Sequence, residues 1–401
     1  MSRWNVFGSL CSMVFLVNLA RVVFAPLLQP VAADFGVTAA SLGIIASAAW
    51  LGSALPRLPT GYVLTKVPRH YVVIATGSLL VVTAAATGLA GSTTHLAVGA
   101  FLMGLSSGMY FIAANPLISE LFPGRVGRAL GIHGMSSQIA AVVAPLVVAA
   151  VLLVTDWRAT FFLISLAALL ITAVLIVATR RTDLPNAGID DRSLLQGGRV
   201  HWRLILTGIA VMGVVGFLWN GLFNLYGDYL EVAKSVDPET GRLLLSAMFA
   251  AGVPAFFISG RLADRVNKIP LLLTISLGFG VAVLGLTVAD GLASIVVWSV
   301  LAGYLFFSLI PVVDTYLLSS LPDRHRGSAY TWYSSTMMII QAFGSGAIGT
   351  AVARGLGYDQ AFVALSLLVG VVAVGLFVLY GLGLVPAGRA RIGESSADGR
   401  P

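Results

Sequence analysis

The sequence predicts an all-α membrane protein with twelve transmembrane helices in two pseudo-symmetric six-helix bundles. The first observation is composition: 58 % of the 401 residues are hydrophobic and 10 % are charged, whereas roughly 25 % of an average soluble domain is charged. The second is a series of twelve apolar runs close to the about 20 residues that a membrane-spanning helix needs. The third is an internal repeat that relates the two halves of the chain.

The apolar runs fall into two sets of six, separated by a polar stretch. The first set lies at 6–29, 39–62, 71–90, 96–119, 128–154 and 158–179. The second set lies at 203–228, 241–262, 269–287, 292–318, 328–352 and 361–383. We therefore expect an N-terminal half at 1–180, a flexible polar linker at 181–202, a C-terminal half at 203–383 and a disordered tail at 384–401.

The basic residues predict how these spans are oriented. If the N-terminus is cytoplasmic, 18 of the 24 Lys and Arg residues fall in cytoplasmic segments. The opposite orientation would place most of them outside and break the positive-inside bias. We expect a multi-pass protein of the plasma or inner membrane with both termini in the cytoplasm. The net charge of +7 therefore sets orientation, and no nucleic-acid partner is expected.

The repeat has an offset of 199 residues, which becomes 200 after one inserted residue. It is carried by matched positions in the two halves: Gly61 and Gly260, Gly104 and Gly303, Pro123 and Pro322, Arg125 and Arg324, Ala129 and Ala329. Two parallel six-helix halves are a transporter architecture, in which the substrate site lies between the halves near the membrane midplane.

The chain resembles the major facilitator superfamily in the loops that join its spans. The family motif G-x-L-A-D-R-x-G-R-[RK] between spans 2 and 3 is matched by GRLADRVNK at 260–268 and, in degraded form, by GYVLTKVPRH at 61–70. The resemblance implies a gate that holds the outward-open state, although Thr65 replaces the acidic residue of the first copy. Alternatively, these loops only set topology. The expected gating residues are Gly61, Lys66, Arg69, Gly260, Asp264, Arg265 and Lys268.

Three ionisable residues lie clearly within the predicted spans: Arg21, Arg57 and Asp314. Each costs about 2.5–3.5 kcal/mol on insertion scales, so such residues usually serve function. Asn18 shares the face of Arg21 one turn earlier, and the repeat maps Arg21 onto Asn220. Together with Asn224, these residues predict a substrate site that carries a positive charge, with amide donors on the opposite side. Such a site is suited to an anionic substrate. The alternative is that Arg21 holds the bundle together.

Arg57 and Asp314 have two interpretations each. The context of Arg57 is similar to the span 2 arginine region of nitrate/nitrite porters, but Phe256 stands where those porters carry a second arginine. Arg57 either helps bind substrate or extends to the interface. Asp314 either carries a coupling proton, since burial raises a carboxyl pKa, or pairs with Arg57 and stays charged.

Two further polar residues are candidate substrate contacts. His133 lies in span 5 near Ser137, and Tyr304 lies in span 10 with Ser308 one turn later. Such groups can hydrogen-bond a substrate, but they more often bond across helices.

Several function classes lack their sequence signals. No nucleotide-binding loop, no zinc-protease or nucleophile-elbow motif and no metal-ligand spacing is found, so we expect no enzyme activity, cofactor or metal site. We predict a monomeric secondary transporter working by alternating access, which moves a small organic or inorganic anion by symport or exchange, with a proton or sodium ion as possible coupling ion. The alternatives are proton-coupled efflux of hydrophobic or cationic compounds, and a solute sensor that signals to a cytoplasmic partner.

Overall fold

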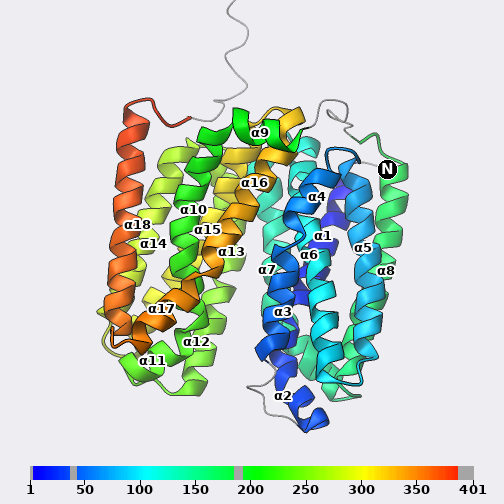
Figure 1. Cartoon of the computed structure of the whole chain (residues 1–401), viewed down its shortest axis with the longest axis horizontal. Helices are drawn as coiled ribbons and strands as arrows, with labels where there is room; N and C mark the ends of the chain where they lie inside the picture. The colour runs from blue at the N-terminus through cyan, green and yellow to red at the C-terminus, as the bar shows by residue number, and fades with distance from the viewer. Residues whose placement is uncertain (1–2, 37–42, 185–192, 387–401) are drawn as a thin grey trace, which may run out of the picture.

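The computed structural model describes residues 3–36, 43–184 and 193–386, and within these ranges all regular structure is helical. Figure 1 shows two helix bundles side by side, with the short helix α9 lying across one end. We name this the linker end and the other the opposite end. The first bundle contains α1 (Arg3–Val22), α2 (Phe24–Phe35), α3 (Gly43–Ala54), α4 (Arg57–Val63), α5 (Arg69–Gly88), α6 (Thr93–Leu121), α7 (Val126–Leu152) and α8 (Arg158–Arg180).

The second bundle follows α9 (Leu194–Val200) and repeats the packing of the first. It contains α10 (Trp202–Asn224), α11 (Tyr226–Lys234), α12 (Pro238–Ala250), α13 (Gly252–Ala263), α14 (Lys268–Thr287), α15 (Leu292–Ser320), α16 (Asp323–Ala342), α17 (Gly344–Ala353) and α18 (Tyr358–Gly381). The pairs α5 with α8 and α14 with α18 occupy corresponding places, as do α1 with α7 and α10 with α16.

Two glycines from the repeat show why the halves pack alike. A Cβ on Gly104 would collide with the backbone oxygen of Ala49, and a Cβ on Gly303 would collide with that of Met248. Because neither glycine has a side chain, α6 can approach α3 as closely as α15 approaches α12. The predicted repeat is therefore visible as a repeated helix crossing.

Eleven stretches of the described residues are long and apolar enough to cross a membrane. The predicted span at 39–62 is the exception, because the chain there forms two shorter helices, α3 and α4, that meet at Leu55 and Pro56. Proline has no N–H to donate and its ring clashes with the preceding turn, so it interrupts a helix. The start of this predicted span, at 39–42, lies outside the described residues.

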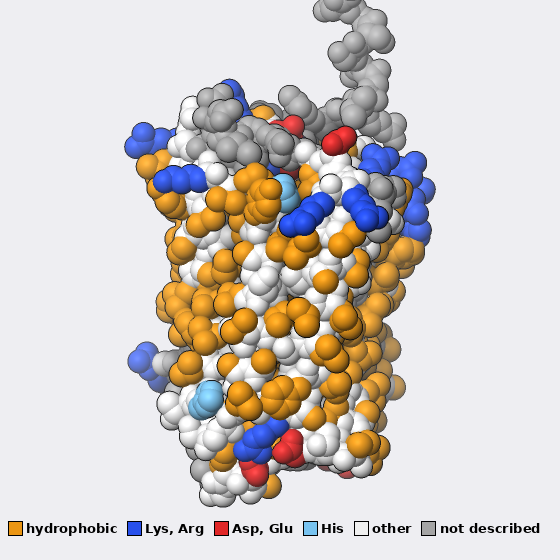
Figure 2. Space-filling model, turned by 90° about the vertical axis from the view of Figure 1, so that its right-hand side faces the viewer, with side chains coloured by type: hydrophobic (Ala, Val, Ile, Leu, Met, Phe, Trp, Pro, Cys, Tyr) orange, Lys and Arg blue, Asp and Glu red, His pale blue; other side chains and the backbone are white. Residues whose placement is uncertain are grey.

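The outer surface suits a lipid environment. Leu166 and Leu170 on α8 are 54 % and 59 % exposed, and Val374 and Phe377 on α18 are 54 % and 57 % exposed. On the face in Figure 2, hydrophobic side chains cover the middle of the molecule, while Lys and Arg gather mainly near the linker end. An exposed belt of this size is costly in water and favourable in hydrocarbon.

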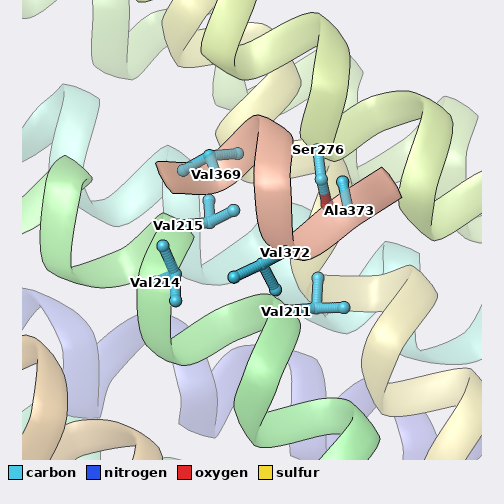
Figure 3. A pocket seen from close by; sticks show the side chains of 7 residues that line it. All are labelled: Val211, Val214, Val215, Ser276, Val369, Val372 and Ala373. Atoms are coloured by element: carbon cyan, nitrogen blue, oxygen red, sulfur yellow. The ribbon is translucent and has the colours of Figure 1, made fainter. Parts of the chain in front are cut away.

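The interior of the second bundle is closely packed. A small apolar void lies between α10, α14 and α18, lined by six aliphatic side chains and Ser276 (Figure 3). Its volume is about 10 Å³, which is at most the space of one water molecule. The Ser276 hydroxyl donates to the Leu272 carbonyl of its own helix at 2.7 Å, so nothing polar is directed into the void.

Part of the predicted flexible linker is a helix. Helix α9 packs on α16, where the Trp332 Nε1–H donates to the Leu194 carbonyl at 3.0 Å. His201 Nε2 lies 3.0 Å from His325 Nδ1, and burial lowers the pKa of His201, with His325 and Arg324 lowering it further. Residues 185–192 of the linker and 387–401 of the predicted tail lie outside the described residues.

Candidate functional site

A cavity of about 570 Å³ lies between the two bundles, within the size range of small-molecule sites. The first bundle lines it mainly with α1, α2 and α7, and the second with α10, α12, α15 and α16. From the middle of the spans it extends toward the opposite end, where Pro26, Pro145 and Ser246 line it. Both halves of the chain therefore contribute to one central site.

Arg21 and Asn18 line this cavity together, as the sequence predicts. One Arg21 guanidinium N–H donates to Asn18 Oδ1 at 2.6 Å, and Asn18 in turn donates to the Ser137 carbonyl on α7 at 2.7 Å. The guanidinium lies over the Trp50 ring, 4.2 Å from its centroid, in a cation–π arrangement.

The positive charge of Arg21 is not neutralised within the described part of the chain. No carboxylate there is within ion-pair distance of it, and its buried Nε–H has no hydrogen-bond partner there. Arg21 is thus held in place by an amide and an indole, and its charge is left available to a ligand.

Arg57 lies at the start of α4, 7 % exposed, and joins the two halves. Its Nε–H donates to the Ser53 carbonyl at 3.2 Å, and one terminal N–H donates to the hydroxyl of Ser334 on α16. It lines the cavity and is close enough to Asp314 for a coulombic attraction, although the two form no direct ion pair.

Asp314 meets its own repeat partner across the interface. The amide of Asn115 on α6 donates to Asp314 Oδ2 at 3.2 Å, and the Tyr330 hydroxyl donates to the same oxygen at 3.3 Å. Asn115 and Asp314 are 199 residues apart, which is the repeat offset, so two equivalent positions touch at the pseudo-two-fold axis. Both residues line the cavity, and Asp314 Oδ1 has no protein partner in the described ranges.

His133 lines the cavity with a defined orientation. The Tyr110 hydroxyl lies 3.0 Å from His133 Nε2 and 2.7 Å from the Leu10 carbonyl. Because a carbonyl only accepts, the hydroxyl proton goes to Leu10, and His133 Nε2 must carry the proton that reaches the tyrosine oxygen. The remaining nitrogen, Nδ1, is then an acceptor on the ring that faces the cavity.

Three predicted substrate contacts lie away from this cavity. Asn220 Oδ1 accepts from the Ser345 N–H at the start of α17 at 3.3 Å. The side chain of Asn224 is exposed and donates to the Asn220 carbonyl at 2.8 Å. Tyr304 packs against the hydrophobic core. None of the three is among the residues that line the cavity.

An aromatic wall on the second half was not anticipated from the sequence. Trp219 stacks on Phe306 with a centroid distance of 4.2 Å and an interplanar angle of 6°, and Phe249 and Phe307 pack against the Trp219 ring. All four line the cavity. In the sequence these residues stand in apolar runs, where an aromatic side chain that faces a cavity looks the same as one that faces lipid.

At the linker end, α7 and α13 cross in close contact and close the cavity. A Cβ on Gly260 would collide with the Gly127 carbonyl and come within 2.8 Å of Gly131 Cα. The Asp264 carboxylate accepts from the N–H groups of Gly127 and Arg128, each at 2.7 Å. These are unpaired N–H groups at the start of a helix, where a negative charge is favourable.

The other predicted gating residues occupy the same end. Burial raises the pKa of the Asp264 carboxyl, while the two backbone hydrogen bonds and the charge of Lys268 oppose that shift. Arg265 follows Asp264 directly in the turn between α13 and α14. The sequence motif around Asp264 thus meets the N-terminus of α7, whose Gly127 and Arg128 N–H groups donate to the Asp264 carboxylate.

The first-half motif is built differently because Thr65 stands in place of the acid. A Cβ on Gly61 would collide with Thr331 of α16, so this crossing is also close. Arg69 pairs with Glu120 at the end of α6, both side chains being 2 % exposed. Lys66 lies over the Tyr62 ring at 4.7 Å.

Comparison with known proteins agrees with this architecture. The family model described as Major Facilitator Superfamily matches residues 10–345 and again 210–397. A probable sulfoacetate transporter of Cupriavidus necator is 24 % identical over 287 residues, or 67 % of this chain and 66 % of the relative. A probable sugar efflux transporter of Helicobacter acinonychis is 25 % identical over 260 residues, or 63 % of this chain and 64 % of the relative. The matches thus span just under two thirds of these relatives.

The fold has a close counterpart among solved structures. The crystal structure of the fucose:proton symporter of E. coli aligns with a TM-score of 0.71 at 19 % identity, covering 93 % of this chain and 98 % of that one. With its eleven described stretches long and apolar enough to cross a membrane, the protein is a multi-pass membrane protein. The chain belongs to the Major Facilitator Superfamily.

Proposed function

We propose that this transporter moves a small organic or inorganic anion, by symport or exchange, through alternating access. One observation carries the proposal: Arg21 lines the central cavity, held by Asn18 and Trp50, with no carboxylate at ion-pair distance among the residues described. A cation in a low-dielectric cavity is expensive unless it is paired. An anionic substrate would supply the missing partner.

The mechanism is a rocking of residues 1–180 against 203–383 around the cavity. The tight crossing of α7 and α13, secured by Asp264, closes the linker end, while the cavity extends toward the opposite end. Arg57, which bonds Ser334 across the interface, acts on the linker side of the bound anion, and Asp314 is placed to carry a coupling proton.

We place the protein in the plasma membrane as a monomer, with the linker end in the cytoplasm. The gathering of Lys and Arg near that end supports this orientation because cytoplasmic loops carry an excess of positive charge. The name of the Cupriavidus relative, a probable sulfoacetate transporter, is in line with an anionic substrate.

Proton-coupled efflux of hydrophobic or cationic compounds is the second candidate. The aromatic wall around Trp219 favours it, since aromatic faces attract cations and apolar rings. The two candidates differ in what they require of Arg21, because a cationic substrate would be repelled by it.

The test is thermal unfolding of the purified protein against a panel of anions, sugars, amino acids and lipophilic cations. A ligand that binds the folded state raises the melting temperature. We expect carboxylates or sulfonates to stabilise the wild type, and Arg21→Gln to weaken their binding about 10- to 100-fold, because hydrogen bonds to a charged group contribute roughly 1.5–3 kcal/mol.

Arg242→Gln is the matched control, since Arg242 is exposed at the opposite end and does not line the cavity. It should respond to anions as the wild type does. Stabilisation by lipophilic cations alone, unchanged in Arg21→Gln, would instead favour efflux.

A further inference from the structure

The central cavity has a polar wall from the first half of the chain and an aromatic wall from the second half, within a lining that is otherwise mixed. The wall from the first half carries polar groups on α1 and α7, namely Asn18, Arg21, His133, Ser137 and Gln138. The wall from the second half carries aromatic rings on α10, α12 and α15, namely Trp219, Phe223, Phe249, Phe306 and Phe307. A ligand that fills this cavity has to contact polar groups on one wall and aromatic rings on the other.

The aromatic wall is ordered by its own packing. Trp219, Phe306 and Phe307 are 5 %, 5 % and 6 % exposed, and the Phe307 ring meets Trp219 at 5.2 Å and 73°. Stacked and edge-on contacts of this kind fix ring orientation. Little side-chain freedom is therefore left to be lost when a flat apolar group binds against them.

Arg21 and the aromatic wall lie at the same depth in the molecule. Arg21 maps onto Asn220 in the repeat, and the pseudo-two-fold axis places such partners at equal depth in their two bundles. Trp219 directly precedes Asn220, and Arg21 and Trp219 both line the cavity, one from each half.

Helix α7 ties the two walls together through adjacent residues. The Ser137 carbonyl accepts from Asn18, which orients Arg21. The neighbouring Gln138 amide donates to the Phe249 carbonyl on α12 at 3.1 Å. Bonds from one turn of α7 thus reach both the group that orients Arg21 and the backbone of Phe249 in this conformation.

The charge of the described lining residues suits a single negative charge. When Asp314 is ionised and histidine is neutral, Arg21 and Arg57 contribute two positive charges and Asp314 one negative charge, so one positive charge remains. Asp314 attracts Arg57, which leaves Arg21 as the charge to be matched. A dianion such as sulfoacetate would exceed this balance and would leave the aromatic wall without a partner.

Resting on the proposed anion transport, we propose that the substrate is an organic monoanion with a flat apolar or aromatic body. Its carboxylate or sulfonate binds Arg21 on the first-half wall, and its body lies against Trp219 and Phe249 on the second-half wall. The substrate then bridges the two halves, so its binding holds them together at the middle of the cavity.

The experiment compares four probes by calorimetry on the purified full chain: acetate, phenylacetate, 2-phenylethanol and sulfoacetate. We expect the wild type to bind phenylacetate at least about tenfold more tightly than acetate, because the ring contacts add to the headgroup contact. Trp219→Leu should reduce the ratio of the affinity for phenylacetate to that for acetate. Arg21→Gln should reduce the ratio of the affinity for phenylacetate to that for 2-phenylethanol.

Two further variants separate loss of ring contacts from loss of folding. Phe223→Leu replaces a half-buried ring of the same wall, and it tests the affinity ratio of phenylacetate to acetate if Trp219→Leu fails to fold. Trp202→Leu is the control, since Trp202 is 52 % exposed at the start of α10 and lies outside the cavity. It should leave every affinity as in the wild type.

The outcomes separate this inference from the proposed function. Equal affinity for acetate, sulfoacetate and phenylacetate, unchanged by Trp219→Leu and Phe223→Leu, would overturn the aromatic body and leave anion transport standing. Equal affinity for phenylacetate and 2-phenylethanol, unchanged by Arg21→Gln, would overturn both. Absence of binding by all four probes would overturn the organic monoanion, while anion transport would still be decided by the wider anion panel.

Discussion

At the scale of single residues, the contact between Asn115 and Asp314 has the clearest consequence. These two residues are repeat partners that meet at the pseudo-two-fold axis, with the Asn115 amide donating to the Asp314 carboxylate at 3.2 Å. The Tyr330 hydroxyl bonds the same oxygen. A carboxylate at position 115 would therefore have much the same surroundings as the one at position 314.

We predict that the coupling role of Asp314 can be moved across the axis. Asp314→Asn should abolish accumulation driven by a pH gradient while exchange of substrate continues, because an amide cannot carry the coupling proton. The double variant Asn115→Asp with Asp314→Asn restores one carboxylate at the axis. It should regain gradient-driven uptake to within about tenfold, or roughly 1.4 kcal/mol, of the wild type.

The measurement is uptake into proteoliposomes with and without an imposed pH gradient. Tyr304→Phe serves as a control, since Tyr304 lies on the same helix as Asp314 but away from the cavity. Undiminished gradient-driven uptake by Asp314→Asn would show that the coupling proton is carried elsewhere.

The limits of sequence inference are also visible at this scale. Arg21, Asn18, Arg57, His133 and Asp314 were identified because ionisable and polar groups are rare in apolar spans, and the structure places all of them at the cavity. The repeat gave the depth of Asn220 but not its direction around the helix. Its neighbour Trp219 faces the cavity, while Asn220 bonds the Ser345 N–H, which the break between α16 and α17 leaves without a helical partner.

At the scale of helices, the crossing of α7 and α13 leaves no room for a larger residue at Gly260. Gly127 and Gly260 bring the two backbones together, and Asp264 bonds the N-terminus of α7 from the other helix. The motif that contains Gly260 and Asp264 was found in the sequence. Its partner on α7 was not, because no local pattern identifies which distant helix presents unpaired N–H groups to it.

We predict that Gly260→Ala separates the two halves at the linker end. A methyl group there meets backbone that cannot turn away, and overpacking of this kind costs typically 1–3 kcal/mol. Spin labels at positions 181 and 382, in a Cys11→Ser background, should show a distance distribution shifted to longer values.

Gly370→Ala is the matched control, because a Cβ on Gly370 has nothing within 4 Å and Ala favours helix. It should leave the distribution unchanged. An unshifted distribution in Gly260→Ala would mean that this crossing does not control closure.

At the scale of the whole molecule, most of the fold was predictable because hydrocarbon imposes one rule on every span. Backbone groups in lipid must be satisfied within the helix, so apolar run length fixed eleven spans and the repeat fixed their pairing. The exceptions were the interrupted helix pair α3 and α4 and the linker helix α9. The break between α3 and α4 follows from Pro56, whereas α9 depends on a tertiary contact, since it rests on α16.

We predict that the opposite end of the cavity is reached from outside the cell. In a Cys11→Ser background, Ser246→Cys should react with a membrane-impermeant thiol reagent in intact cells, because Ser246 is exposed and lines the cavity at that end. Ser259→Cys, 3 % exposed near the closed crossing, should not react. Labelling of Ser246→Cys only in inside-out vesicles would reverse the proposed orientation.

The docking of α9 shortens the covalent connection between the two bundles. Because α9 is fastened to α16 through Trp332 and His325, the covalent path between the bundles reduces to the stretch from Arg180 to Leu194. Cutting the chain within this stretch should leave two polypeptides whose reunion depends on their shared interface alone.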